Sequence, residues 1–200
     1  MNCSPSPPHY GPELTTLLEQ AELAPLDAGR PVTGVSDQLR RLLRTGRFAG
    51  LKIVDEAAAR ACMAGLWLRF NELDESHRIS QELHSSTGSY WHAIMHRREG
   101  DFGNSKFWFR QTGQHPVLDH LTEAVRELPA EYGTSGETLP EACRALKSRP
   151  TWDPFRFVDA CEAVVRGKLN AERWCRDVQQ CEWQLLFDDC FTRAVQGNEG

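Results

Sequence analysis

The sequence predicts an all-α protein, because helix signals run through most of the chain and strand signals are missing from it. Apolar residues recur at intervals of three and four, as in Val117, Leu121, Val125 and Leu128, and this spacing places them on one face of a helix. Neither the apolar–polar alternation nor the Asn-Gly turns of paired strands occur. Hydrophobic residues make up 40% of the 200 residues and charged residues 26%, which is ordinary for a folded domain. We therefore expect packed antiparallel helical hairpins with a long C-terminal helix.

The chain divides into a short leader and one helical domain. Residues 1–12 contain four prolines and are expected to form a flexible leader. Residues 13–200 are long enough to bury a core as a single all-helical domain. Within it, residues 130–140 hold the glycine, serine and proline typical of a surface loop, so they mark a loop break between helices.

Capping residues and apolar stripes place the helices along the chain. Asp153 and Pro154 form an N-cap and a first helical position, Gly100 ends a helix that follows Gly88, and Pro129 closes another. The expected helices are, in order, 14–21, 36–43, 54–70, one capped by Asp74, 90–99, one capped by Asn104, 117–128, one from Pro154 and 171–195.

Two stretches of the chain are similar to each other. Residues 64–81 align with residues 93–110 without gaps, at an offset of 29, and Ala64 then meets Ala93. Each copy reads as a helix, a polar turn and a second helix, with a small residue where the helices would cross. This pattern resembles tetratricopeptide-type helical hairpins, although the period is shorter than the usual ~34 residues. The alternative is any two antiparallel helical pairs in a bundle.

Charge and hydropathy exclude some classes of function. The 23 Lys+Arg and 28 Asp+Glu residues give a net charge of −5, whereas a protein that tracks nucleic-acid phosphates normally carries a basic excess. No stretch approaches the ~18–20 apolar residues that span a bilayer. We therefore expect neither nucleic acid nor membrane as a partner.

The cysteines and the N-terminus indicate a compartment. The N-terminal residues have no basic start and no apolar run, so no secretory signal is expected. The odd count of seven cysteines and their wide spacing predict free thiols in a reducing, cytoplasmic setting. The cysteines are Cys3, Cys62, Cys143, Cys161, Cys175, Cys181 and Cys190.

One segment is unusually rich in histidine, arginine and tryptophan. Six of the seven histidines lie between His77 and His120, and the centre of this segment reads GSYWHAIMHRREGDFGNSKFWFRQTGQHP. The block resembles a motif, YWHAIMHRREGDFGNSKFWFR, of an uncharacterised group of bacterial and fungal helical proteins. The resemblance covers mainly residues 73–116, with weaker similarity in WDPFRFVDACE and CEWQLLFDDC. The resemblance implies that the segment is important for the function of these proteins, but it assigns no role to the segment.

The spacing within this block is suited to a metal ion. His92, His96 and Glu99 are separated by four and three residues, so all three share one face of the expected helix. Two imidazoles and a carboxylate form a facial set for a single transition metal of the zinc type. A further ligand could come from the residues His84, Asp101 or His115. Glu99 could instead be the catalytic base of a metal-activated water, and a metal-free alternative is a hydrogen bond between His96 and Glu99.

The same segment offers a second kind of site. Cationic and aromatic side chains could hold an anionic ligand between guanidinium groups and rings, and the residues proposed for this role are Arg97, Arg98, Lys106, Arg110, Trp91 and Trp108. The alternative is that Arg97 or Arg98 pairs with Glu99 or Asp101 while the aromatic rings fill the core. Elsewhere, Glu162 and Glu182 are expected at the surface.

Two functions follow from these patterns. The first is a helical binding or scaffold protein whose groove at residues 77–116 takes a protein segment or a small anionic molecule. The second is a metal-dependent, hydrolytic enzyme in which His92 and His96 bind the metal and Glu99 is a third ligand or the base.

Overall fold

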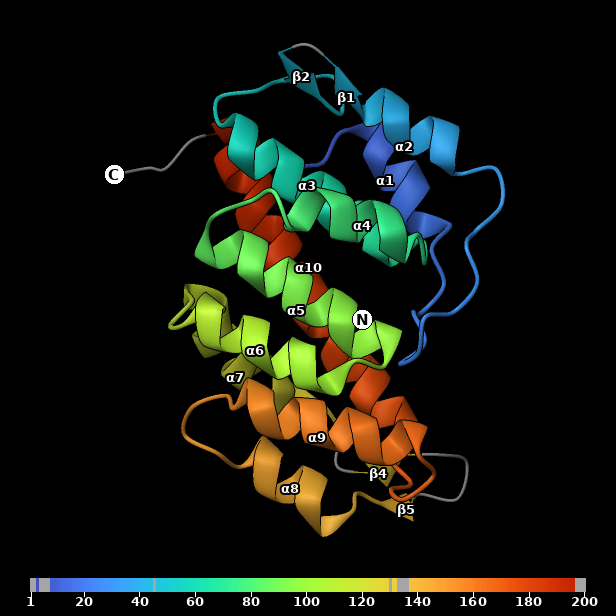
Figure 1. Ribbon diagram of the computed structural model, residues 1–200, viewed down its shortest axis with the longest axis vertical. Coiled ribbons are helices and arrows are strands. Elements are labelled where there is room, and N and C mark those ends of the chain that lie inside the picture. Colours follow the sequence, from blue (N-terminus) through green and yellow to red (C-terminus); the bar gives the residue numbers. More distant parts are fainter. Residues whose placement is uncertain (1–2, 4–7, 45, 130, 133–136, 197–200) are drawn as a thin grey trace.

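Helices make up most of the structure. This computed structural model describes residue 3 and residues 8–44, 46–129, 131–132 and 137–196 (Figure 1). Within these ranges the expected helical fold class is confirmed. The helices are α1 (Pro12–Glu19), α2 (Ser36–Leu42), α3 (Glu56–Arg69), α4 (Leu73–Ser80), α5 (Ser86–Glu99), α6 (Phe102–Thr112), α7 (Pro116–Glu127), α8 (Glu141–Lys147), α9 (Pro154–Val165) and α10 (Glu172–Gln196).

Five strands of two residues each accompany the helices in the described part of the chain, and the sequence did not predict them. β1 (Leu43–Arg44), β2 (Arg47–Phe48) and β3 (Leu51–Lys52) form an antiparallel sheet in which Phe48 pairs with both Leu43 and Leu51. β4 (Glu131–Tyr132) pairs with β5 (Glu137–Thr138) inside the expected loop at 130–140, of which residues 130 and 133–136 lie outside the described residues. Strands of two residues are too short to show an alternating pattern, so periodicity could not predict them.

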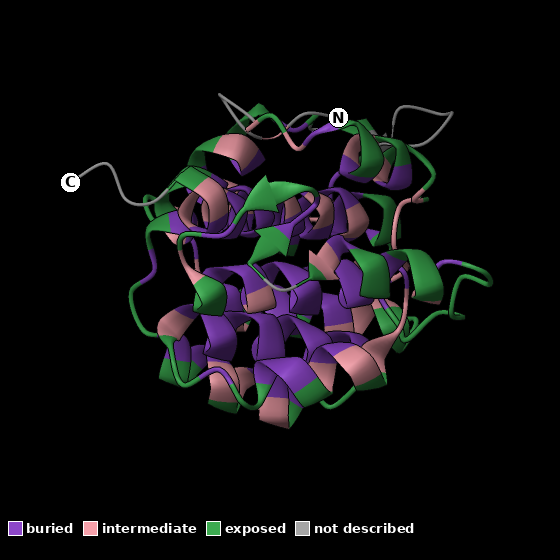
Figure 2. Ribbon diagram, turned by 90° about the horizontal axis from the view of Figure 1, so that it is seen from above, coloured by how far each residue is buried: buried purple, intermediate pink, exposed green. Residues whose placement is uncertain are grey.

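The long C-terminal helix α10 forms the centre of the fold. It packs against α3, α7 and α9, and in Figure 1 it crosses the molecule behind α5. Trp174, Phe187 and Phe191 of this helix are fully buried. Figure 2 shows the buried residues gathered in the inner helices and the exposed residues around them. Apolar side chains on several sides of α10 therefore lie at the centre of the core, as its broad apolar stripe predicts.

Helices that follow one another in sequence also pack together. α3 contacts α4, α4 contacts α5, and α5 contacts α6, which agrees with the expected helical hairpins. At the contact of α3 with α5, a Cβ atom on Gly65 would lie 2.7 Å from the ring of Trp91. The tetratricopeptide-like repeat itself stays a prediction, because packing of neighbouring helices occurs in many bundles.

Several helix boundaries match the expected caps, and two do not. Asp153 accepts a hydrogen bond from the backbone N–H of Arg156 at the start of α9, and Gly100 ends α5 with a φ of 88°. However, Asp101 rather than Asn104 caps α6, because its carboxylate accepts from the N–H of Asn104. Asp74 lies inside the first turn of α4, whose N-cap is Glu72.

An irregular segment near the N-terminus is bound to the helices by side chains. We name residues 21–28 the strap. Arg69 of α3 and Arg98 of α5 donate to the carbonyls of Ala21 and Ala28 at 3.0 and 3.2 Å. From α10, Arg176 donates to Ala24 at 3.2 Å and Gln179 to Pro25 at 3.0 Å. The strap forms no helix or strand, so its own backbone does not satisfy these carbonyls. The side chains donate the hydrogen bonds instead.

The cysteines differ in part from expectation. A disulfide joins Cys3 to Cys181 in α10, so the prediction of seven free thiols is wrong for these two residues. Their sequence separation is 178, and no spacing rule connects residues so far apart. The free thiols of Cys62, Cys143, Cys161, Cys175 and Cys190 are all buried.

None of the helices in the described residues combines the length and the apolar character that a membrane span requires.

Candidate metal centre

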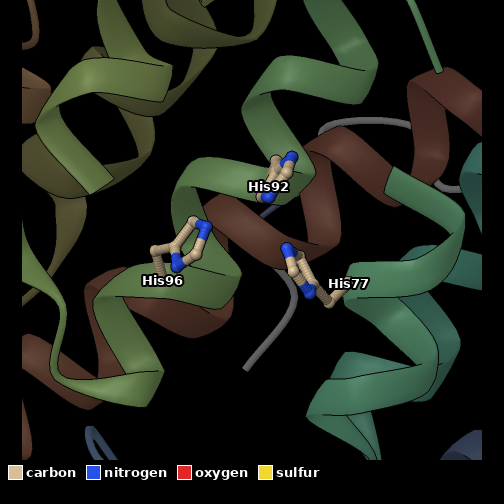
Figure 3. Close-up of side chains that lie close together, drawn as sticks. All are labelled: His77, His92 and His96. Carbon is tan, nitrogen blue, oxygen red and sulfur yellow. The ribbon is translucent and has the colours of Figure 1, made fainter. Parts of the chain in front are cut away.

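Three imidazoles converge where α4 packs against α5. His77 comes from α4, and His92 and His96 come from successive turns of α5 (Figure 3). One ring nitrogen from each histidine lies within 4.8 Å of the other two. His92 is 2% exposed and His96 6% exposed, while His77 is half-buried. We call these three residues the histidine cluster.

The turn between α4 and α5 sets the position of His77. Ser85 caps α5 by accepting a hydrogen bond from the N–H of Gly88 at 3.0 Å, so the helix starts earlier than expected and Gly88 lies inside its first turn. A Cβ atom on Gly88 would lie 2.2 Å from the carbonyl oxygen of Leu83. Only glycine allows this approach of the chain to itself, and the close approach holds α4 against α5.

His96 is oriented by hydrogen bonds at both ring nitrogens. Its Nδ1 lies 3.0 Å from Oε2 of Glu99, and its Nε2 lies 3.0 Å from Nδ2 of Asn104. A carboxylate only accepts and an amide NH₂ only donates. The proton therefore sits on Nδ1 and the lone pair on Nε2. A carboxylate behind a histidine ring is the usual support of a metal ligand, because it fixes the tautomer and the ring orientation.

The ring of His92 is buried between two other rings. Its ring stacks on Trp108 with a centroid distance of 4.0 Å and on His96 with 4.8 Å, both at 16°. Neither Nδ1 nor Nε2 of His92 has a hydrogen-bond partner among the described residues. A buried polar group left without a partner costs about 1–3 kcal/mol. A metal ion would engage one of these two nitrogens.

Burial keeps His92 and His96 neutral. Burial, together with the neighbouring His96 and His77, lowers the pKa of His92 to about 3. Burial also lowers the pKa of His96, although the hydrogen bond and charge of Glu99 act in the opposite direction. Neutral imidazole is the form that coordinates a metal. Both residues therefore hold their lone pairs at neutral pH without first losing a proton.

The nitrogens of the cluster lie within 4.8 Å of one another, which is wider than the spacing of ligands around a bound metal. Ligand bonds of 2.0–2.1 Å in a tetrahedral site place nitrogens about 3.3 Å apart. Separations of up to 4.8 Å within the cluster would therefore have to shorten by as much as about 1.5 Å around a bound ion. Rotation of the three side chains about their χ angles would have to supply this change.

The structure brings together two of the three residues proposed as metal ligands and adds one that sequence reasoning missed. Glu99 lies outside the cluster, 54% exposed, with its carboxylate on His96. His77 takes the third place. The proposed outer ligands are elsewhere: His84 is exposed, Asp101 caps α6, and His115 caps α7. The spacing on one helix could reveal His92 and His96, but His77 depends on how two helices pack.

The two arginines proposed for anion binding are committed to the fold. Arg97 forms a fully buried ion pair with Glu182 of α10, so the expectation that Glu182 lies at the surface is wrong. Arg98 donates to the carbonyls of Leu68, Asp27 and Ala28 and to Asn71 Oδ1. An anion at either guanidinium would have to displace these contacts.

The other residues proposed for ligand binding are spread over different surroundings. Trp91 is buried against Gly65, and Trp108 stacks on His92. Lys106 pairs with Asp159 of α9. Arg110 lies over the ring of Phe155, 5.9 Å from its centre. Of the six residues, Arg110 lines an open groove of about 870 Å³ between α6, the start of α7 and the start of α9.

Comparisons with protein-family models, with curated proteins and with solved structures found no match to this chain. A functional conclusion therefore depends on the geometry of the histidine cluster and its neighbours.

Proposed function

We propose that this protein binds one divalent transition metal ion, zinc or a metal of similar preference, through His77, His92 and His96. The observation that carries the proposal is the state of His92, a buried imidazole with no hydrogen-bond partner among the described residues, facing two further imidazoles within 4.8 Å. A coordinate bond would remove the cost of that isolation. Glu99 would support the site by holding His96 in the coordinating tautomer.

The ligand type favours some metals over others. Imidazole nitrogen suits zinc, copper, nickel and iron, whereas calcium and magnesium prefer carboxylate and carbonyl oxygens. The cluster found in the described part of the chain is made of histidines alone. The cluster is therefore expected to bind a soft or borderline divalent metal ion.

Metal analysis tests this proposal directly. We expect untagged protein, purified without chelators, to contain about one zinc-like ion per chain, or to acquire one when the metal-free protein is titrated with zinc. His77→Ala should lose the metal, and so should the double variant His92→Ala/His96→Ala. The matched control is His120→Ala, because His120 is exposed on α7. Protein that takes up no zinc, copper, nickel or iron would refute the proposal.

Hydrolysis is the more specific activity that a metal at this place could support. A catalytic site keeps one coordination position for water, and three histidines alone leave such a position. Glu99 is less suited to be the base than to position His96, because its carboxylate already accepts the Nδ1 proton of that ring. A hydrolytic role thus depends on what fills the fourth position.

A second candidate function, binding of a protein segment or small anionic molecule, is supported by the groove beside Arg110. The groove also includes the aromatic residues Phe109, Trp152 and Phe155, which together with the guanidinium could hold an anionic group against a ring. Thermal shift with a panel of organic phosphates and dicarboxylates tests this function. Stabilisation that disappears in Arg110→Ala would support it, and an unchanged melting temperature across the panel would contradict it.

A further inference from the structure

Asn104 occupies the direction in which His96 would bind a metal. Glu99 holds the proton on Nδ1 of His96, which leaves Nε2 as the coordinating nitrogen. The amide of Asn104 lies 3.0 Å from this Nε2. A metal ion bound at 2.0–2.1 Å would stand between the two groups. The amide therefore has to turn away or become a ligand itself.

The backbone keeps Asn104 within reach of the site. Its N–H donates to the carboxylate of Asp101 at 3.0 Å. The next residue, Ser105, is buried and donates through its hydroxyl to the carbonyl of Ala93 in α5 at 2.8 Å. The first bond caps α6, and the second ties its first turn to α5. Rotation about the last side-chain bond of asparagine is soft, and half a turn replaces Nδ2 by Oδ1 with no backbone movement.

On these contacts, and resting on the proposed metal function, we propose that Asn104 supplies the fourth ligand through Oδ1. In the metal-free protein its NH₂ group donates to Nε2 of His96. In the metal-bound protein its carbonyl oxygen faces the ion. Three imidazoles and one amide oxygen complete a tetrahedral set, and a site with four protein ligands is closed to water. The metal would then stabilise the α4–α5–α6 arrangement and would not activate water.

Cobalt(II) provides the test, because its visible absorption reports the number and geometry of its ligands. Metal-free wild-type protein titrated with cobalt should give the intense bands of a four-coordinate ion. These bands should not change on addition of azide, which binds only where a position can exchange. We expect Asn104→Ala to bind cobalt and zinc about tenfold or more weakly and to respond to azide. Asn104→Asp, which keeps an oxygen at the same place, should keep the bands and the affinity.

The matched control is Gln111→Ala, since Gln111 is an exposed amide on the same helix. Circular dichroism and thermal melting of the metal-free variants show whether each variant folds. If Asn104→Ala does not fold, Asn104→Asp is the test variant. Wild-type protein that binds neither cobalt nor zinc would overturn the metal function as a whole. Wild-type protein that binds metal while Asn104→Ala binds as tightly with the same spectrum, or wild-type bands that shift with azide, would overturn the role of Asn104 alone.

Discussion

Arg97 and Glu182, separated by 85 residues, form an ion pair in which both side chains are fully buried. The hydroxyl of Tyr90 donates to the same carboxylate at 3.2 Å, and the guanidinium lies 4.7 Å from the centre of the Phe157 ring. The pair thus connects α5, which carries two residues of the histidine cluster, with α10 and α9. This buried position explains why Arg97 does not face solvent, although it lies in the centre of the segment rich in histidine, arginine and tryptophan.

Removal of one member of this pair should destabilise the protein strongly. Glu182→Leu leaves the buried Arg97 charge without its ion-pair partner, and such losses cost about 3–5 kcal/mol. We expect a drop of this size in the free energy of unfolding, measured with guanidinium chloride. The double variant Arg97→Met/Glu182→Leu should lose much less than the two single variants together. As a control, Arg166→Ala removes a surface pair with Glu162 and should change stability by at most about 1 kcal/mol. A loss as small for Glu182→Leu would contradict the burial of this pair.

Stability of the metal-free protein should decrease as the pH falls below about 6.5, the ordinary histidine value. The folded pKa of His92 is about 3, so between these values the unfolded chain binds a proton that the folded chain does not. The contribution of His92 to the free energy of unfolding is therefore fully present above about pH 6.5. It is lost as the pH falls toward about 3, by up to about 1.4 kcal/mol per pH unit for one proton. Burial lowers the pKa of His96 and His115 in the same direction.

Denaturation curves between pH 7.5 and 5, recorded with a chelator present, measure this dependence. His92→Phe keeps the ring stack on Trp108 but cannot take a proton, so its slope should be smaller than that of the wild type. The exposed His120 provides the comparison, and His120→Ala should keep the full slope. Equal slopes for wild type and His92→Phe would show that His92 titrates normally in the folded protein.

Glu99 should affect metal affinity without binding the metal. The hydrogen bond from Nδ1 of His96 fixes the ring, and loss of such a supporting carboxylate weakens metal binding about 10–100-fold. We expect this change for zinc in Glu99→Ala, measured by competition with a coloured chelator. Glu123→Ala, on the exposed side of α7, should bind as the wild type does. An unchanged zinc affinity in Glu99→Ala would mean that the Glu99 carboxylate is not needed to position the His96 ring.

Gly88 should tolerate no side chain. In Gly88→Ala the new Cβ atom would lie 2.2 Å from the carbonyl oxygen of Leu83, so the turn that places His77 beside α5 must open. We expect a clear drop in melting temperature and weaker metal binding. Gly103→Ala is the matched control, because the nearest atom would be 3.7 Å away and alanine is favoured in a helix by up to about 1 kcal/mol. Equal melting temperatures of the two variants would contradict the close approach.

The features that sequence could predict are local ones. Asp153 and Gly100 cap helices as expected, and the apolar stripe of the last helix corresponds to a buried α10. His92 and His96 share a face because helix geometry alone decides it. In each of these cases the cause lies within a few residues of the effect.

The features that sequence could not predict depend on residues far apart. His77 joins His92 only through the packing of α4 on α5, and the burial of Glu182 follows from its partner Arg97 rather than from its neighbours. Asn104 reads as a helix cap from its position in the sequence, yet its side chain turns to His96 because Asp101 already caps α6. Local propensity leaves such choices open, and tertiary contacts decide them.

The strap has a consequence for the synthesis of this protein. Residues 21–28 leave the ribosome early, but the donors that bind Ala24 and Pro25 are Arg176 and Gln179, more than 150 residues later. Elongation runs at about 5–20 residues per second, so these carbonyls wait for many seconds until the last helix emerges. The contacts of Ala24 and Pro25 are therefore among the last in the fold to form, and an unfinished chain that ends before α10 can bind the strap only through Arg69 and Arg98.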